Sequence, residues 1–166
     1  MRRIKFVLVL LCFFTLSNIG KAQDIMRSKN NIFLELGGNG GLFSINYERA
    51  LSTNLNGRVG FGSWTSSFLG GKETKITTIP VMLNHLVGKR KSFFEMGGGF
   101  LFGNKNENNI SSSIFDLTAF LGYRYQALGD GILFRIGMTP FLSLDNKANY
   151  PDKAFISGGF SIGYHF

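Results

Sequence analysis

The sequence predicts an all-β protein, namely an eight-stranded antiparallel up-and-down transmembrane β-barrel that is preceded by a cleaved signal peptide. Three observations support this fold class. The first 22 residues have the pattern of an export signal, the rest of the chain alternates apolar and polar residues in eight short segments, and the links between these segments alternate between short and long.

The export signal has three parts. A basic start is followed by an apolar stretch from Phe6 to Leu16 and by a small-residue exit that ends at Ala22. The apolar stretch is shorter than the roughly 20 residues that a helix needs to cross a bilayer, which favours a cleaved signal over residues 1–22 and not a membrane anchor. Cys12, the only cysteine, lies inside this signal. The mature chain is therefore expected to have no disulfide, thiolate metal site or cysteine nucleophile.

The remaining chain is expected to form a short periplasmic segment over residues 23–31 and a single barrel domain over residues 32–166. Its net charge is low, because the signal contains four of the 18 Lys and Arg residues and none of the 10 acids, which leaves +4 in place of +8. This small, dispersed charge argues against a nucleic-acid partner. The abundance of Gly and Phe, with 22 and 18 residues, favours strands with one small or polar face and one large apolar face.

Eight alternating segments are separated by clusters of Gly, Asn, Asp, Ser and Lys. They cover residues 32–39, 41–49, 55–64, 76–87, 93–103, 114–126, 132–144 and 154–166. In the sixth segment, Leu117 and Leu121 alternate with Asp116 and Thr118, so that one face is apolar and the other is polar or small. The second, seventh and eighth segments show the same division.

The polar face is expected to line the inside of the barrel. It lacks the many lysines of a solubilising surface, which argues against the alternative of a soluble lipocalin-like barrel with the apolar face inside. A turn over residues 127–131 would place Arg124 and Arg135 directly opposite each other, and two like charges so placed require acids nearby. The residues expected to form a paired network in a filled lumen are Glu35, Glu48, Arg58, Glu95, Asp116, Arg124 and Arg135.

The links between segments predict which end of the barrel faces the periplasm. Those over residues 50–54, 88–92 and 127–131 are compact, whereas those over residues 65–75, 104–113 and 145–153 are longer and more polar. Outer-membrane barrels have short periplasmic turns and long extracellular loops. The glycine-dense residues 38–41 are an exception, because they predict a tight outer hairpin with positive φ angles.

Ring-bearing residues are expected to form a girdle at the periplasmic interface, where rings with a polar edge are favoured. They are Tyr47, His85, Tyr125, Tyr164 and Phe166. This girdle is a further argument for a membrane barrel.

A set of motifs is spread over nearly all of the mature chain. They are IFLELGGNGG (residues 32–41), NYER (46–49), IPV (79–81), FEMGGG (94–99) and YHF (164–166). Together with the signal they resemble the small outer-membrane β-barrel proteins of Bacteroidetes-type bacteria, a mostly uncharacterised group. The resemblance implies an outer-membrane barrel and no enzymatic residue. The ending with Tyr164 and Phe166 also resembles the signal read by the barrel-assembly machinery, which is implied as a partner.

The residues give little support to an enzyme. A lipid A deacylase would need a His, a Ser and an acid grouped near the outer leaflet, whereas His85 and His165, the only histidines, fall at the expected periplasmic rim. No catalytic, cofactor or metal site is predicted. Trp64 is expected to anchor the outer interface, with contact to a ligand as the alternative. The basic run from Lys89 to Lys91 reads as a solvated turn or as a contact with anionic headgroups.

The expected function is therefore a non-enzymatic outer-membrane barrel that supports envelope integrity or presents its outer loops to a partner. Its expected partners are outer-membrane lipids, the barrel-assembly machinery and an extracellular molecule that the sequence does not identify. A lipid-modifying or lipid-binding enzyme and a narrow solute channel are the alternatives.

Overall fold

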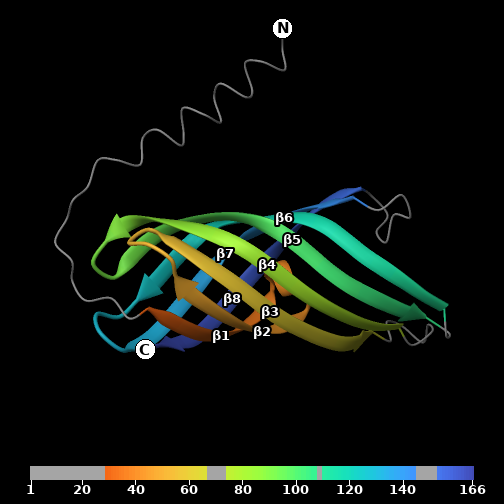
Figure 1. Ribbon diagram of the computed structural model, residues 1–166, viewed down its shortest axis with the longest axis horizontal. Helices are drawn as coiled ribbons and strands as arrows, with labels where there is room; N and C mark the ends of the chain where they lie inside the picture. The colour runs from red at the N-terminus through yellow and green to blue at the C-terminus, as the bar shows by residue number, and fades with distance from the viewer. Residues whose placement is uncertain (1–28, 67–73, 108–109, 145–152) are drawn as a thin grey trace, which may run out of the picture.

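A computed structural model describes residues 29–66, 74–107, 110–144 and 153–166, which form a closed barrel of eight strands (Figure 1). The strands are β1 (Asn30–Gly37), β2 (Phe43–Ala50), β3 (Leu55–Ser66), β4 (Thr74–Lys89), β5 (Ser92–Glu107), β6 (Ile110–Gln126), β7 (Gly131–Ser143) and β8 (Ala154–His165). A short 3-10 turn, η2 (Gly38–Gly40), joins β1 to β2. The predicted signal peptide and most of the predicted periplasmic segment lie outside the described residues.

The barrel closes because each strand pairs with its sequence neighbours and β1 pairs with β8. Ile32 of β1, for example, is opposite Tyr47 of β2 on one side and Tyr164 of β8 on the other. Closure leaves no free sheet edge along the spanning part, as a strand protein in lipid requires. The predicted fold class is confirmed. β1 begins two residues earlier than expected, at Asn30.

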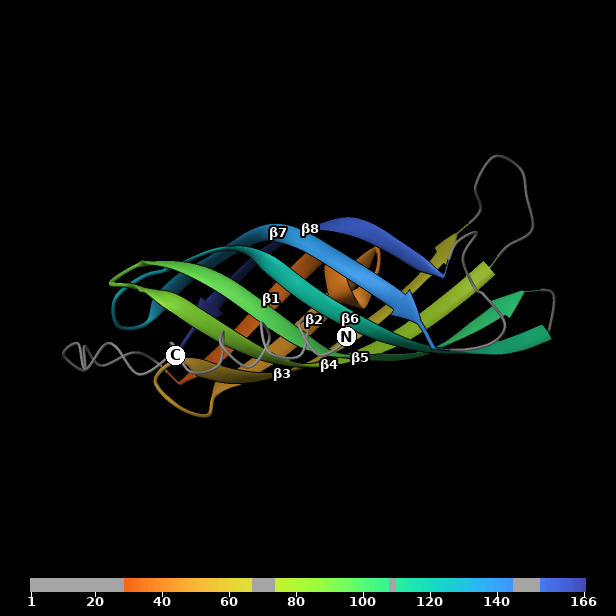
Figure 2. The ribbon, with the colours of Figure 1, turned by 90° about the horizontal axis from the view of Figure 1, so that it is seen from above.

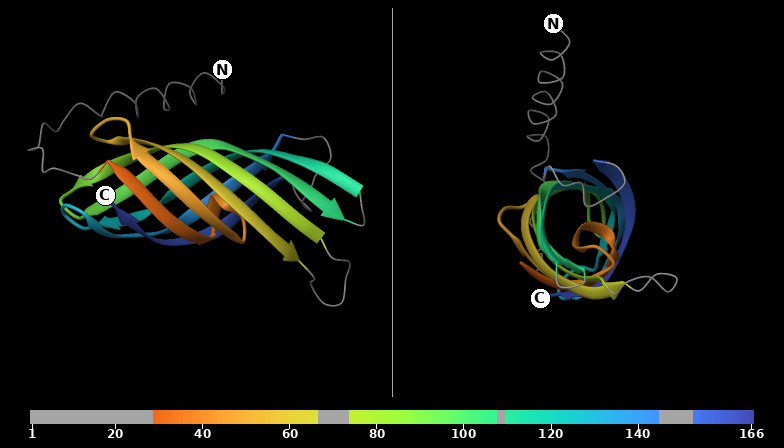
Figure 3. Two further views of the ribbon diagram at one scale, coloured as in Figure 1. Left: turned by 60° about the horizontal axis from the view of Figure 1, so that its bottom comes forward. Right: turned by 90° about the vertical axis from the view of Figure 1, so that its right-hand side faces the viewer.

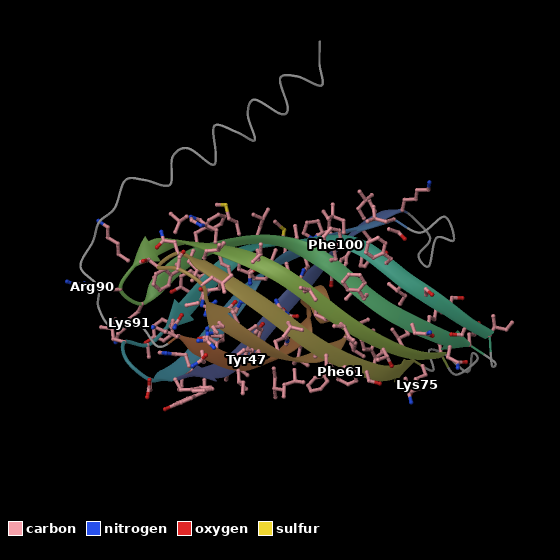
Figure 4. All side chains as sticks on the ribbon, viewed as in Figure 1. Tyr47, Phe61, Lys75, Arg90, Lys91 and Phe100 are labelled. Atoms are coloured by element: carbon pink, nitrogen blue, oxygen red, sulfur yellow. The ribbon has the colours of Figure 1, made fainter. Side chains whose placement is uncertain are left out.

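Side chains alternate between the two faces as the sequence predicted. On β6, Leu117 and Leu121 are exposed on the outside, while Asp116 and Thr118 are buried inside. Phe61 and Phe100 point outward from the middle of the barrel (Figure 4). The soluble-barrel alternative requires the opposite arrangement and is excluded. Among the described residues there is no helix that is long and apolar enough to cross a membrane.

Strand lengths differ around the barrel. β1 and β2 have eight residues each, whereas β4, β5 and β6 have 16, 16 and 17. One part of the wall therefore projects beyond the rest at the end opposite the short turns (Figure 2).

The prediction of a long loop over residues 104–113 is wrong. β5 runs to Glu107 and β6 begins at Ile110, so that these polar residues continue the ladder, with Asn104 opposite Ser113. Asn and Ser are common in loops, but here the ladder satisfies their backbone groups. Ser111 also donates a 2.8 Å hydrogen bond to the Asn104 side chain. Of the other two expected long loops, residues 67–73 and 145–152 lie outside the described part.

The sequence predicts an outer hairpin loop between β1 and β2, but the structure does not have one. Gly37, Gly38 and Gly41 have the predicted positive φ angles of 65°, 75° and 93°, but the turn folds into the lumen, where all three η2 residues are buried (Figure 3). Glycine permits the close approach. A Cβ on Gly37 would lie 2.2 Å from the backbone oxygen of Gly158.

Candidate functional site

Six charged side chains meet inside the lumen, in the half of the barrel nearest the short turns. They are Glu35 on β1, Glu48 on β2, Arg58 on β3, Glu95 on β5, Arg124 on β6 and Arg135 on β7, and all are buried. Each reaches the lumen because it occupies an inward position of its strand. Three carboxylates and three guanidiniums give this cluster, the lumen network, no net charge.

The first ion pair joins Arg58 to Glu35 through Nη2 and Oε2. Arg58 also donates from Nε and Nη2 to Oδ1 of Asn46, at 3.0 and 2.8 Å. The Glu35 carboxylate accepts a further hydrogen bond from the backbone N–H of Gly40 at 3.3 Å. This pair therefore also holds the inserted η2 turn.

The second ion pair joins Arg135 to Glu95 through two parallel hydrogen bonds and is therefore two-pronged. Arg135 donates from Nε and Nη2 to the two oxygens of Glu95, at 2.9 and 2.8 Å. Its guanidinium lies over the rings of Phe33 and Phe120, with its central carbon 4.7 and 4.5 Å from their centres. Stacking on aromatic rings and pairing with a carboxylate together suit the planar guanidinium.

The third pair joins Arg124 to Glu48, with 2.7 Å between Nη1 and Oε1. The Glu48 carboxylate also accepts hydrogen bonds from the side-chain amides of Asn31, Asn56 and Asn84, at 3.0, 3.0 and 3.2 Å. Four donors around one buried carboxylate replace the water that it loses on burial.

Asp116 is the seventh residue of the sequence-based network. It is fully buried on the inward face of β6, opposite Leu101 on β5 and Ser143 on β7, toward the outer end. The ion pairs of the three buried arginines are made with the three glutamates.

An apolar layer lies in the lumen on the outer side of the lumen network. Leu101, Ile114 and Phe141 are buried together, and Phe155 stacks on Phe141 with 4.6 Å between the ring centres. The expectation of a polar or small inner face missed this layer. The signal was present, because these residues stand at inward positions of strands that otherwise follow the alternation.

Trp64 does not anchor the outer interface, contrary to expectation. It occupies an inward position of β3, opposite Ile76, and its ring lies against Gly41, where an added Cβ would be 2.0 Å from the ring. Parity could have shown this, because Trp64 lies six residues after the inward Arg58.

The η2 turn crosses the lumen between the lumen network and the outer end. The Asn39 amide donates to Thr118 Oγ1 at 2.6 Å and to the Ala119 carbonyl at 3.0 Å, both on β6. Thr78 on β4 donates to the Gly40 carbonyl at 2.6 Å. The turn thus lies inside the barrel (Figure 3).

The predicted girdle residues Tyr47, Tyr164 and Phe166 are exposed on the outer face. The two histidines point to opposite faces, since His85 is on the outside of β4 and His165 is buried inside β8. Within the described residues, no three His, Cys, Asp or Glu side chains form a group that could hold a metal ion.

A closed barrel with an apolar exterior and an interior filled by ion pairs and apolar side chains defines the class of this protein. It is an eight-stranded β-barrel of the outer-membrane type.

Solved structures share this fold. The N-terminal β-barrel domain of OprF from Pseudomonas aeruginosa aligns with a TM-score of 0.61 and 10% sequence identity, over 83% of this chain and 96% of that one. Neisserial surface protein A, NspA, aligns with a TM-score of 0.56 and 14% identity, over 83% and 92% of the two chains. At such identities the likeness shows the fold alone. No protein-family model and no curated protein sequence matches the chain.

Proposed function

We propose that the protein is a non-enzymatic, non-conducting barrel of the bacterial outer membrane that presents a projecting part of its wall to an extracellular partner. The main observation behind this proposal is the outer wall, defined as residues 62–66, 74–78, 103–107 and 110–114 of β3 to β6. The ladder of β2 with β3 ends at Ile45 and Phe61, and the ladder of β7 with β6 reaches only Asp116. The outer wall therefore stands beyond its neighbours on both sides (Figure 2).

The outward face of the outer wall is polar, unlike the apolar belt below it. Two rungs cross it, one made of Ser63, Thr77, Asn104 and Ser113 and the other of Thr65, Lys75, Asn106 and Ser111. Because such side chains gain nothing from lipid, this sheet is expected to lie outside the membrane. A polar, hydrogen-bonded sheet is a rigid surface on which a partner can bind.

The two alternative functions have less support. The apolar layer and the η2 turn fill the lumen where a solute channel would run. A lipid-modifying enzyme would need an activated hydroxyl near the outer leaflet, but His165 is buried near the opposite end and His85 faces outward.

A shortened barrel tests the role of the outer wall. Replacing residues 104–113 by Asn-Gly keeps Gly103 opposite Ile114 as the last pair of a tight hairpin. A deletion strain would be complemented with the wild-type or the shortened barrel, and adhesion and envelope stress would be measured. We expect the shortened barrel to fold and to leave envelope stress at the wild-type level, but to lose adhesion. Full rescue of adhesion by the shortened barrel would contradict this proposal. If the shortened barrel restores adhesion but fails to relieve envelope stress, the envelope-integrity function would be favoured.

Two expectations from the sequence remain proposals. Membership of the Bacteroidetes-type barrel group rests on the motifs of the sequence. Recognition of Tyr164 and Phe166 by the barrel-assembly machinery is supported by their position, since Tyr164 is exposed near the end of β8 and Phe166 is exposed directly after it.

A further inference from the structure

Exposed cations gather at the end of the barrel that carries the short turns. Lys29 precedes β1, Arg49 lies near the end of β2, Lys89 ends β4, and Arg90 and Lys91 form the next turn. We name these five residues the basic collar. Figure 4 shows Arg90 and Lys91 past the strand ends, with Lys75 at the opposite end of the barrel.

The basic collar follows directly after the apolar belt. Lys89 takes the next outward position after Val87, which is exposed on the lipid-facing side of β4. Arg49 likewise takes the next outward position after Tyr47, a girdle residue on β2. These side chains therefore leave the barrel sideways, at the depth where the apolar core of a membrane gives way to headgroups.

The cations of the basic collar are not neutralised by acids of the described chain. The ion pairs of the described residues involve other cations, namely the three buried arginines and Lys105 at the outer end, whose Nζ is 3.3 Å from Glu107. Asp130, in the turn before β7, is the acidic side chain that the described residues place outside the lumen at this end, against the five cations of the collar. The collar thus carries an excess of positive charge.

We propose that the basic collar binds the phosphate groups of anionic phospholipids in the periplasmic leaflet of the membrane. Lys and Arg near a membrane surface attract anionic headgroups, and long side chains can reach them while their stems contact apolar surface. The outward direction of Arg49 and Lys89 favours a lipid partner over a periplasmic protein, because these side chains face along the membrane plane.

The test compares lipid selectivity between variants of the full mature barrel. Each barrel is placed in nanodiscs of phosphatidylcholine with a minor fraction of phosphatidylglycerol, and the lipids that remain attached on release are counted by native mass spectrometry. We expect the wild type at low salt to enrich phosphatidylglycerol about fivefold, the factor for one cation beside one anionic headgroup. Raising the salt should reduce the enrichment, because screening shortens the range of the attraction.

The variant Lys89→Gln/Arg90→Asn/Lys91→Gln is expected to lose most of this enrichment. Asn is chosen at position 90 because Arg90 has a positive φ of 59°, which Asn tolerates. Arg49→Gln leaves the turn untouched and should lower the enrichment on its own. Folding of each variant is checked by its mobility shift on heating.

The matched control is Lys75→Gln/Lys105→Gln/Lys153→Gln, which removes the same charge from the outer end and should keep the enrichment. The proposal is overturned if both collar variants select phosphatidylglycerol as the wild type does, which would favour a periplasmic protein as the partner. The proposal is also overturned if the control loses as much phosphatidylglycerol enrichment as the collar variants do. The attraction of anionic lipids would then depend on the total charge of the barrel and not on the collar.

Discussion

Arg124 and Arg135 lie directly opposite each other in the β6–β7 ladder, and both are fully buried. Glu95 lies between them. Its carboxylate makes the two-pronged pair with Arg135 and also lies 3.6 Å from Arg124, whose closer partner is Glu48. Two like charges can face each other inside the barrel because shared carboxylates from β2 and β5 compensate them.

Removing the shared carboxylate should be costly. Glu95→Gln keeps the shape of the side chain but leaves Arg135 without its main counter-charge, so we expect the free energy of unfolding to fall by about 3 to 5 kcal/mol. Urea unfolding of the barrel in lipid vesicles measures this. Glu107→Gln is the control, since its partly exposed pair with Lys105 is worth less than about 1 kcal/mol. Equal effects of the two substitutions would mean that the lumen network does not stabilise the barrel.

The filled lumen should not conduct ions. The apolar layer around Phe141 and the η2 turn held by Asn39 both occupy the lumen of the described part of the barrel. We expect little or no steady conductance from the pure protein in planar bilayers. Large, long-lived ohmic openings would revive the channel hypothesis.

Charge on the outer face should be harmful only within the apolar belt. Leu117→Arg places a charge in lipid and is expected to destabilise the barrel by about 2 to 4 kcal/mol, the cost of an arginine near mid-membrane. Ser113→Arg, on the same face of β6 but in the outer wall, should have little effect. Thr118 is unsuitable as the control, because the structure buries it against Asn39. Equal costs for the two arginines would mean that the membrane boundary lies elsewhere.

Gly37, the last residue before the η2 turn, should not tolerate a side chain. Gly37→Ala forces an L-residue into a positive φ and places a Cβ 2.2 Å from the Gly158 oxygen, so the loss should exceed about 1 kcal/mol. Gly98→Ala serves as the comparison, because its Cβ would meet nothing within 4 Å. Thermal unfolding of both variants checks this, and similar midpoints would show that η2 can move aside.

The end of β8 should matter more for assembly than for stability. Phe166→Ala removes an exposed ring but keeps the backbone hydrogen bonds of 2.9 and 3.0 Å between residue 166 and Asn30. We expect less assembled barrel in cells than with Ile162→Ala, a similarly exposed position of the same strand, although both refold with similar stability in detergent. Parallel losses in cells and in detergent would reduce the role of Phe166 to packing.

The sequence alone indicates that most strand positions divide into an apolar and a polar face, and the small number of lysines on the polar face favours its lining the lumen, although Trp64 is assigned to the wrong side. A strand has a period of two residues, so the alternation places Leu117 and Thr118 on opposite faces without knowledge of any distant residue. The compact link over residues 127–131 likewise sets the local register of β6 and β7, which is enough to place Arg124 opposite Arg135.

The tertiary structure alone decided which inward residues meet across the lumen. Glu35, Glu48 and Glu95 come from three strands, and their distances to the arginines depend on how the strands are staggered around the closed barrel. The inward fold of η2 and the ladder over residues 104–113 are non-local in the same way. Turn and polar residues predict where a chain can bend or leave lipid, but the space and pairing offered by other strands decide whether it does.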